Sequence, residues 1–355
     1  MIDNTDSTKK KALIAMSGGV DSSVSAVVMK KQGYDIVGCT MRLNGNSCLT
    51  DKSVEDAKAV ADKMGIPHYA VDFSDCFKEK VIDNFISCYE QGLTPNPCIE
   101  CNRYLKFDKL LEKAFELGCE YIVTGHYAVV EYDEKSDRHL LKKAADEAKD
   151  QSYFLYKLTK EQLKHVKLPL AALTKDETRK IAEDEGFVTA HKKDSQDICF
   201  IPDGKYANFI EEMSDRKYPE GDFIDVNGNV LGRHNGIIRY TIGQRKGLGL
   251  ALNEPMYVKE VNVKDNTVML ARDEELYSSE LIANRINLIS VDKIEGEMEV
   301  KAKIRYRHNE APAIVTQIDE DTIKVIFKEP QRAITRGQAV VLYDGDVVVG
   351  GGTII

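Results

Sequence analysis

The chain has 355 residues, which is too long for one ordinary hydrophobic core and predicts two or three domains. Apolar residues make up 43% and charged residues 30% of it, as in ordinary globular proteins. Its apolar runs are shorter than a membrane span, and the polar start MIDNTDSTKK lacks the core of a signal peptide, so we expect a cytoplasmic protein with no membrane partner. The net charge of −9 argues against a surface covered with positive charge for nucleic acid, but it permits a local basic stripe.

The first motif is a turn of small residues between a predicted strand and a predicted helix. The apolar run from Leu13 to Met16 is typical of a buried parallel strand, and the valines from Val24 onward have helical spacing. Between them, Ser17-Gly18-Gly19 carries little side-chain bulk, so backbone N–H groups can close on an anion. The pattern predicts a phosphate cradle, with a ligand-free glycine turn as the alternative. It lacks the Gly-Lys-Ser/Thr ending of the common triphosphate loop, and an acid, Asp21, stands nearby.

Alternating strands and helices follow this turn and predict an α/β fold with a doubly wound parallel sheet. The predicted strands cover residues 36–43, 67–73 and 121–124, and the predicted helices cover residues 53–65, 75–89 and 105–118. Ligands of such sheets bind at the carboxyl ends of the strands. Met41 and Gly125 lie at two of these ends, which makes them candidate nucleotide contacts, although a methionine there is more often core packing. His126 is a candidate substrate contact, although a lone histidine is more often structural.

All eight cysteines lie within the first 199 residues, which in a reducing compartment indicates thiol chemistry or metal binding. Cys98 and Cys101 form a CxxC pair in the segment 94–102, where two prolines predict a rigid loop. A structural zinc site would need a second such pair, and a thioredoxin-like redox pair would need a different setting. In the third interpretation one of these thiols works with Cys199: one carries a persulfide sulfur and the other resolves it as a disulfide.

The rest of the chain contains a charged insertion, a helix and then β-type segments. Residues 131–149 predict an exposed hairpin or flexible insertion, and Thr174–Glu177 predicts a capping box for a helix. After residue 220, short alternating segments are separated by Asn-Gly and Asp-Gly turns. We expect a domain boundary near 203, a softer one near 276, and a small antiparallel barrel thereafter. The run Arg305-Tyr306-Arg307 interleaves cations with an aromatic ring, as nucleic-acid surfaces do, although arginines that simply face water fit the pattern equally well.

Several strings resemble known families. SGGVDSS resembles the PP-loop of ATP pyrophosphatases, which hold ATP by its pyrophosphate end and transfer AMP. Strings along essentially the whole chain resemble the bacterial tRNA-specific 2-thiouridylases: NPCIECN, TGHYA, DQSYFLY, DSQDICFI, YTIGQRKGLG, RYRHNEAPA and GQAVVLYDGDVVVGGGTI. The resemblance implies a PP-loop domain at 1–203, a central linking domain at 204–275, and a C-terminal β-barrel at 276–355 that contacts tRNA. It implies ATP-dependent 2-thiolation of the wobble uridine (U34) in the tRNAs for Glu, Gln and Lys.

The resemblance also implies which residues carry the first half-reaction. The uracil O2 would attack the α-phosphorus of ATP, accompanied by Mg²⁺, and AMP would become the leaving group. ATP would be held by Ala15, Met16, Ser17, Gly18, Gly19, Val20, Asp21, Ser22, Met41 and Gly125. The target base would lie against Asn96, Pro97 and Cys98. The other tRNA contacts would be His126, Lys149, Asp150, Gln151, Arg305, Tyr306 and Gln338.

For the sulfur step, the resemblance implies that Cys199 carries a persulfide and that Cys101 is its partner nucleophile. Cys101 would release the sulfur as sulfide or form a disulfide with Cys199 after transfer, and a cysteine desulfurase or relay protein would supply the sulfur. One position departs from the better-known family pattern, which has Asp where this chain has Cys98. Cys98 either replaces the acid or completes, with Cys101 and Cys199, a three-cysteine site for a [4Fe-4S] cluster that would carry the sulfide. We rank the persulfide route, which uses no protein-bound metal, ahead of the cluster.

Two other functions compete with sulfur transfer. A PP-loop ligase would use ammonia to displace AMP and would need no cysteine, so loss of Cys101 and Cys199 would leave its product unchanged. A tRNA-binding or redox-sensing protein would hold a nucleotide without turnover, and it would release no pyrophosphate when mixed with tRNA and Mg-ATP.

Overall fold

The structure is a computed structural model that describes residues 9–43, 51–192 and 198–355. The chain forms two compact units, one made of residues 1–80 and 99–202 and the other of residues 81–98 and 203–355. The first eight residues, which carry most of the polar start, lie outside the described residues, as do residues 193–197, which include the first four letters of the DSQDICFI motif. No helix among the described residues is long and apolar enough to span a membrane.

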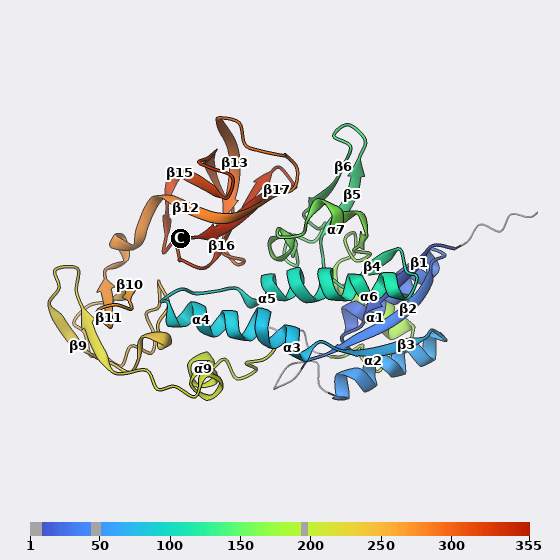
Figure 1. Ribbon diagram of the computed structural model, residues 1–355, viewed down its shortest axis with the longest axis horizontal. Helices are drawn as coiled ribbons and strands as arrows, with labels where there is room; N and C mark the ends of the chain where they lie inside the picture. Colours follow the sequence, from blue (N-terminus) through green and yellow to red (C-terminus); the bar gives the residue numbers. More distant parts are fainter. Residues whose placement is uncertain (1–8, 44–50, 193–197) are drawn as a thin grey trace, which may run out of the picture. The chain divides into compact units, whose positions relative to one another are not determined.

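The first unit contains a five-stranded sheet in which every pairing is parallel, with the order β3-β2-β1-β4-β7 (Figure 1). Its strands are β1 (Lys11–Ala15), β2 (Asp35–Arg42), β3 (His68–Asp72), β4 (Tyr121–Val123) and β7 (Val166–Lys167). The predicted parallel sheet is confirmed. Strands β2, β3 and β4 lie within one residue of their predicted bounds, β1 begins two residues before the predicted run, and β7 was not predicted. Chain order runs outward from β1 to β3 and resumes at β4 on the other side of β1. The topological switch point, where ligands bind in such sheets, therefore lies between β1 and β4.

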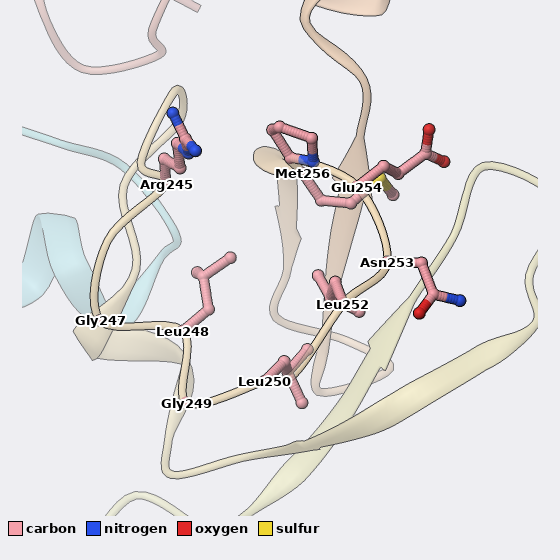
Figure 2. Close-up of a pocket in the computed structure, with 10 residues that line it drawn as sticks. Arg245, Gly247, Leu248, Gly249, Leu250, Leu252, Asn253, Glu254 and Met256 are labelled. Carbon is pink, nitrogen blue, oxygen red and sulfur yellow. The ribbon is translucent and has the colours of Figure 1, made fainter.

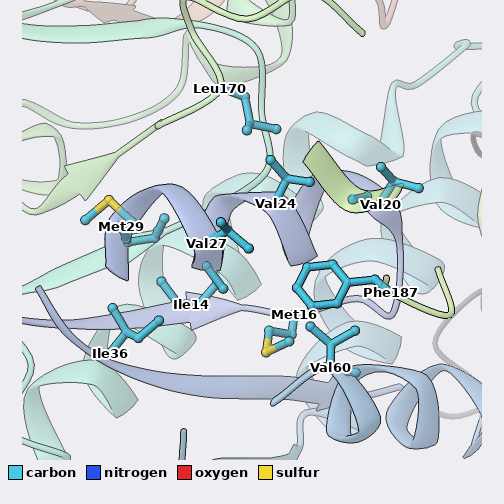
Figure 3. Packing of buried hydrophobic residues seen from close by; sticks show 14 of the residues in the cluster. Ile14, Met16, Val20, Val24, Val27, Met29, Ile36, Val60, Leu170 and Phe187 are labelled. Atoms are coloured by element: carbon cyan, nitrogen blue, oxygen red, sulfur yellow. The ribbon is translucent and has the colours of Figure 1, made fainter. Parts of the chain in front are cut away.

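Helices cover both faces of this sheet. The main ones are α1 (Val20–Lys31), α2 (Asp51–Met64), α6 (Leu110–Glu116) and α8 (Lys175–Asp184). Val24 and Val27 of α1 pack with Ile14 of β1 and Val60 of α2 in one buried cluster (Figure 3). Residues alternate between the faces of a strand, so Leu13, which lies between the cluster members Ala12 and Ile14, points to the opposite face. Helix α6 contacts β1 and β4 but contributes nothing to this cluster, which places it on that opposite face.

The cysteine segment is helical, which corrects the sequence-based expectation. The loop predicted at 94–102 ends at Asn96, because α5 (Pro97–Glu100) begins there and continues into the π-helix η2 (Cys101–Lys109). A proline is tolerated in the first turn of a helix, where its missing N–H has no intrahelical partner to lose. The predicted helix at 75–89 is a composite of α3 (Ser74–Phe77), the π-helix η1 (Lys78–Asp83) and α4 (Asn84–Glu90).

The capping box is confirmed, and the charged insertion is a hairpin over residues 129–142 in which Leu140 and Leu141 are buried. The insertion forms a hairpin of β5 (Val129–Asp133) and β6 (Arg138–Lys142). Thr174 caps α8 and exchanges reciprocal bonds with Glu177, as a capping box does. The remaining short helices of the first unit are η3 (Ser152–Leu155) and α7 (Lys160–Lys164).

The second unit contains a small sheet and a closed barrel. Helix α9 (Tyr206–Ser214) precedes the small sheet, whose strand order is β10-β11-β8-β9. Its strands are β8 (Gly221–Ile224), β9 (Val230–His234), β10 (Tyr257–Asn262) and β11 (Thr267–Ala271). Two 3-10 turns, η4 (Ile237–Arg239) and η5 (Asp273–Leu276), lie in the same region of the chain. The barrel strands are β12 (Tyr277–Leu288), β13 (Glu297–Lys303), β14 (Ala311–Gln317), β15 (Thr322–Arg332), β16 (Ala339–Asp344) and β17 (Val347–Ile354). All pairings among them are antiparallel, and β12 pairs with both β15 and β17, which closes the predicted barrel.

Candidate active site

The glycine turn follows β1 at the switch point and is held by specific hydrogen bonds. Met16 N–H donates to the Cys39 carbonyl at 2.8 Å, and the Thr40 hydroxyl donates to the Met16 carbonyl at 2.8 Å. The Ser17 amide donates to the Ser22 hydroxyl at 3.1 Å. These bonds fix the turn between the end of β1 and the start of α1, so its shape exists before a ligand arrives.

Two glycines allow other parts of the chain to pack closely around this turn. Gly18 has φ +68°, and a Cβ built there would lie 2.4 Å from the Ser53 carbonyl oxygen of α2. Gly125, just beyond β4, lies so close to the start of α1 that a Cβ there would be 2.9 Å from the Ser22 amide nitrogen. Helix α1 begins after Gly19 without a side-chain cap, so its first N–H groups are available to an anion. The arrangement fits the phosphate end of ATP, as the sequence predicts.

Asp21 is held by a cation and a phenol. Lys175 Nζ, at the start of α8, lies 2.6 and 2.8 Å from the two Asp21 carboxylate oxygens, and the Tyr127 hydroxyl donates to Oδ1 at 2.9 Å. Tyr127 also contacts the Thr178 hydroxyl at 3.0 Å. Lys192 adds a second cation, whose Nζ donates to the Gly18 carbonyl at 2.8 Å and pairs with Asp56. The turn therefore has two lysines at its edge, and neither follows from the motif itself.

Replacing Lys175 with Met should destabilise the protein by about 2 kcal/mol, because a largely buried carboxylate then loses its ionic partner. Lys175 is 10% and Asp21 33% exposed at the side chain, so this figure is below that of a fully buried pair. The free energy of unfolding in urea measures the loss. Lys180→Met, at an exposed position of the same helix, is the matched control and should leave stability unchanged. Equal stabilities of the two variants would contradict the importance of the pair.

The predicted thiols are held differently from one another. Cys101 is half-buried at the first position of η2, and Cys199 is half-buried next to Phe200. The Phe200 ring packs edge-on against Phe77 of α3, with 5.6 Å between the ring centroids. This contact holds the backbone next to Cys199 against α3. Cys98 is exposed, and its amide donates to the Asn96 side chain at 3.2 Å. Among the described residues, no group of three His, Cys, Asp or Glu side chains is placed to hold a metal ion.

Three of the four predicted tRNA contacts of the first unit, His126, Asp150 and Gln151, make hydrogen bonds within that unit. His126 is buried, with Nδ1 2.7 Å from the Thr124 hydroxyl, and burial lowers its pKa well below the usual value, with Lys106 adding to the shift. It is therefore neutral near pH 7. Asp150 is also buried and accepts bonds from the Ala144 amide at 3.0 Å and the Ser152 hydroxyl at 2.7 Å. Lys149 is partly exposed. The roles of these residues toward tRNA stay predictions.

The predicted contacts of the second unit also have internal partners. Arg305 bonds the Ile242 carbonyl at 3.2 Å, the Ala333 carbonyl at 2.5 Å and the Thr335 hydroxyl. Gln338 Nε2 donates to the Thr94 carbonyl at 2.8 Å, so it holds the chain just before Asn96 and Pro97. Lys303 Nζ lies over the Tyr306 ring, 5.6 Å from the ring centroid. Arg305 and Gln338 thus brace the barrel and the chain beside the predicted base-binding residues, and their contacts with tRNA stay predictions.

Met41 and a pocket in the second unit are two further candidate ligand contacts. Met41 lies at the end of β2 with its side chain buried, so the structure shows core packing and leaves a nucleotide contact as a prediction. The pocket, of about 400 Å³, lies within the loop 245–256. Figure 2 shows Arg245 on one side of it, and Leu248 and Leu250 on its wall. None of the predicted ATP-binding or thiol residues lines this pocket.

Four residues near the site were missed by sequence reasoning: Lys175, Lys192, Asn102 and Lys157. Asn102 Nδ2 donates to the Phe154 carbonyl at 3.1 Å, and Lys157 forms an ion pair with Glu100. Asn102 lies inside the quoted NPCIECN string, so its position beside Cys101 was the available signal. The partners of the three lysines lie 57 to 174 residues away along the chain, and no local sequence pattern indicates them.

A parallel sheet with an uncapped helix after a rigid glycine turn at its switch point defines a nucleotide-binding domain of the PP-loop class. Comparisons with known proteins agree. A family model described as tRNA methyl transferase HUP domain matches residues 10–203, one described as tRNA methyl transferase PRC-barrel domain matches residues 207–272, and one described as aminomethyltransferase beta-barrel domain matches residues 278–354.

Curated relatives match along nearly their whole length. A tRNA-specific 2-thiouridylase MnmA of Clostridioides difficile is 51% identical over 97% of this chain and 98% of its own. Those of Acetivibrio thermocellus and Clostridium perfringens are each 49% identical over 98% of this chain and 99% of their own. The chain belongs to the MnmA family of tRNA-specific 2-thiouridylases.

Proposed function

We propose that the protein is a tRNA-uridine 2-sulfurtransferase, which uses ATP to replace the O2 of the wobble uridine (U34) with sulfur. The observation that carries this proposal is the identity of about half the residues, over nearly the full length, with relatives named for 2-thiouridylation. The phosphate-binding turn and the half-buried Cys101 and Cys199 supply the chemical groups that the reaction needs.

In the first half-reaction, the uracil O2 attacks the α-phosphorus of ATP. The new O2–phosphorus bond forms as the bond to pyrophosphate breaks, which leaves an O-adenylated uridine. The N-terminus of α1 and the turn Ser17-Gly18-Gly19 would hold the departing pyrophosphate, because uncapped N–H groups favour negative charge. Mg²⁺ would accompany the phosphates and neutralise part of their charge.

In the second half-reaction, the terminal sulfur of a Cys199 persulfide attacks C2, and AMP leaves with the former O2. The Cys101 thiolate then attacks the Cys199 sulfur, which forms a Cys101–Cys199 disulfide and leaves the sulfur on C2 as 2-thiouridine. Alternatively, Cys101 attacks the persulfide first, and the released sulfide displaces AMP. Both sequences end in the same disulfide, which an external dithiol must reduce before the next turnover.

The finer assignments belong to this proposal. The substrates would be the tRNAs for Glu, Gln and Lys, a cysteine desulfurase or a relay protein would load Cys199, and the reaction would take place in the cytoplasm. Asn96, Pro97 and Cys98 would lie against the target base, and the three-part division at residues 203 and 275 would separate adenylation, linking and tRNA-contacting domains. The ammonia-ligase alternative is not favoured, since the relatives that cover the whole chain are named as thiouridylases. The cluster-based route would give the same product, and these names do not favour it.

The test is nucleoside mass spectrometry of tRNA after incubation with purified protein, Mg-ATP and a persulfide-forming sulfur donor. We expect 2-thiouridine at the wobble position only when ATP and the donor are both present. Wobble uridine that keeps its mass in the complete reaction would contradict the proposal. A ligase would instead give an amino-substituted base when ammonia is supplied.

Affinity for tRNA should fall with salt although the protein is acidic overall. Each lysine or arginine that neutralises a phosphate adds about 0.7–0.9 to the slope of log K against log salt concentration, because binding releases counterions. Lys149→Met should therefore reduce the slope by about 0.7–0.9, whereas Lys180→Met on α8 should not. Filter binding between low and physiological salt measures both. A flat salt response of the unmodified protein would contradict local phosphate contacts.

A further inference from the structure

The residues on either side of Cys101 are tied to one short stretch of chain. Glu100 forms an ion pair with Lys157, and Asn102 donates its side-chain N–H to the Phe154 carbonyl at 3.1 Å. Phe154 and Lys157 both lie within residues 151–157, which we call the bridging segment and which begins with Gln151 and the 3-10 turn η3. The candidate nucleophile is thus fixed from both sides by the same segment.

These two contacts are unusual because they are buried. The Lys157 and Glu100 side chains are only 5% and 14% exposed, and Asn102 is 3% exposed. Buried ion pairs are weak contributors to stability, because desolvation offsets their attraction, and an apolar pair of the same size is often as stable. What such a pair provides is a defined geometry. Here it lies beside Cys101, which begins a π-helix, a structure that is rare and frequent at functional sites.

The other end of the bridging segment leads to the nucleotide turn. Gln151 and Tyr127 exchange two bonds: the Gln151 amide donates to the Tyr127 carbonyl at 2.7 Å, and the Tyr127 amide donates to Gln151 Oε1 at 3.0 Å. The Tyr127 hydroxyl then donates to Asp21 at 2.9 Å. A continuous set of bonds therefore runs from the PP-loop through the bridging segment to both neighbours of Cys101, all within the first unit.

We infer that the bridging segment couples tRNA binding to the position of Cys101, with Lys157 and Asn102 as positioning residues for this thiol. The segment begins at Gln151, which is the last residue of the predicted tRNA-binding run Lys149–Gln151. A tRNA bound to this run would therefore contact the same segment that holds Glu100 and Asn102, the neighbours of Cys101. The inference rests on the proposed function for the meaning of that run and that thiol. It adds that nucleophile geometry is set by substrate contact.

The test compares Glu100→Met, Lys157→Met and the double variant. Each single change leaves a buried group without its ionic partner and should lower the midpoint of thermal unfolding, whereas the double change should restore it. The double variant should still thiolate tRNA about 100-fold more slowly, because a thiol displaced by about 1 Å loses that much rate. Pyrophosphate release that depends on tRNA should stay near the wild-type rate, since adenylation does not use the thiol. Lys157→Arg, which keeps the charge, should recover part of the thiolation rate.

A second readout follows the thiol itself. Peptide mapping after brief iodoacetamide treatment gives the alkylation rate of Cys101 with and without tRNA. In the wild-type protein tRNA should change this rate severalfold, and in the double variant tRNA should leave it unchanged. The matched control replaces both members of the exposed pair Glu161 and Lys164 of α7 with Met, and it should behave as the wild type in every measurement.

Two results would overturn the inference. The first is a stable double variant that thiolates tRNA at the wild-type rate, and the second is a double variant whose Cys101 still responds to tRNA as the wild type does. A wild-type protein that forms no 2-thiouridine would contradict the proposed function instead. In that case the alkylation measurement, which requires only tRNA, still decides whether the bridging segment couples the two sites.

Discussion

Cys199→Ala is expected to abolish thiolation and to leave adenylation nearly intact. If Cys199 carries the transferable sulfur, its removal takes away the covalent intermediate, a loss that costs on the order of 10⁴-fold or more in rate. The attack of O2 on ATP uses the glycine turn after β1 and no thiol, so pyrophosphate release that depends on tRNA should persist. Mass spectrometry of the wobble nucleoside and a coupled pyrophosphate assay separate the two steps.

The matched control for Cys199 is Cys76→Ala. Cys76 is half-buried as Cys199 is, and burial raises the pKa of its thiol, which disfavours the reactive thiolate. This variant should form 2-thiouridine at the normal rate. Full thiolation by Cys199→Ala would exclude the protein persulfide, and loss of pyrophosphate release in that variant would show that Cys199 has a part in adenylation.

Gly18→Ala is expected to reduce pyrophosphate release by about 100-fold, because it displaces the groups that hold the phosphates by a fraction of an ångström or more. The added methyl would lie 2.4 Å from the Ser53 carbonyl oxygen, which belongs to the backbone of α2 and cannot rotate away. The residue must also keep φ near +68°, which costs a non-glycine residue about 1–2 kcal/mol. The ATP concentration dependence of pyrophosphate release measures the effect.

Gly118→Ala provides the matched control for this prediction. Gly118 has φ +70°, nearly the same as Gly18, but a Cβ there would have nothing within 4 Å. This variant should therefore lose about 1–2 kcal/mol of stability through its backbone and release pyrophosphate normally. Equal activity of the two variants would show that the close approach of Gly18 to α2 is not needed for catalysis.

The parallel sheet could be predicted because its signal is local. Strands buried on both faces, such as β1 and β2, read as short apolar runs, and glycines follow the helices between them. The sequence predicts the closed barrel less clearly than the parallel sheet. Its strands alternate and its turns carry Asp-Gly, as at Gly345, but the pairing of β12 with both β15 and β17 joins segments that are distant in sequence. Closure was inferred from the number of short strands and from the family resemblance.

The cysteine segment shows where the local signal failed. Two prolines in 94–102 predicted a loop, but Pro97 is the first residue of α5, where proline is compatible with a helix. Both Cys98 and Cys101 are therefore on helical backbone. The distinction between a proline that blocks a helix and one that begins it depends on the residues that follow, and here Cys98–Glu100 gave no capping signal that could decide it.

The contacts around the site could not be predicted at all, because their partners are remote. Lys175 and Asp21 are separated by 154 residues, and Gln338 and Thr94 by 244. The family resemblance implies that Arg305 and Gln338 contact tRNA, and the structure gives each an internal partner that its local sequence does not indicate. Sequence motifs identified the reacting groups, whereas the residues that position them emerged only from the fold.

The most direct measurement uses tRNA whose wobble uridine carries oxygen-18 at O2. If that oxygen attacks ATP and later leaves with AMP, mass spectrometry will find one oxygen-18 atom in the AMP phosphate for each 2-thiouridine formed. Oxygen-18 that remains in the nucleoside, or that appears in water or pyrophosphate while AMP stays unlabelled, would contradict adenylation of the uridine oxygen.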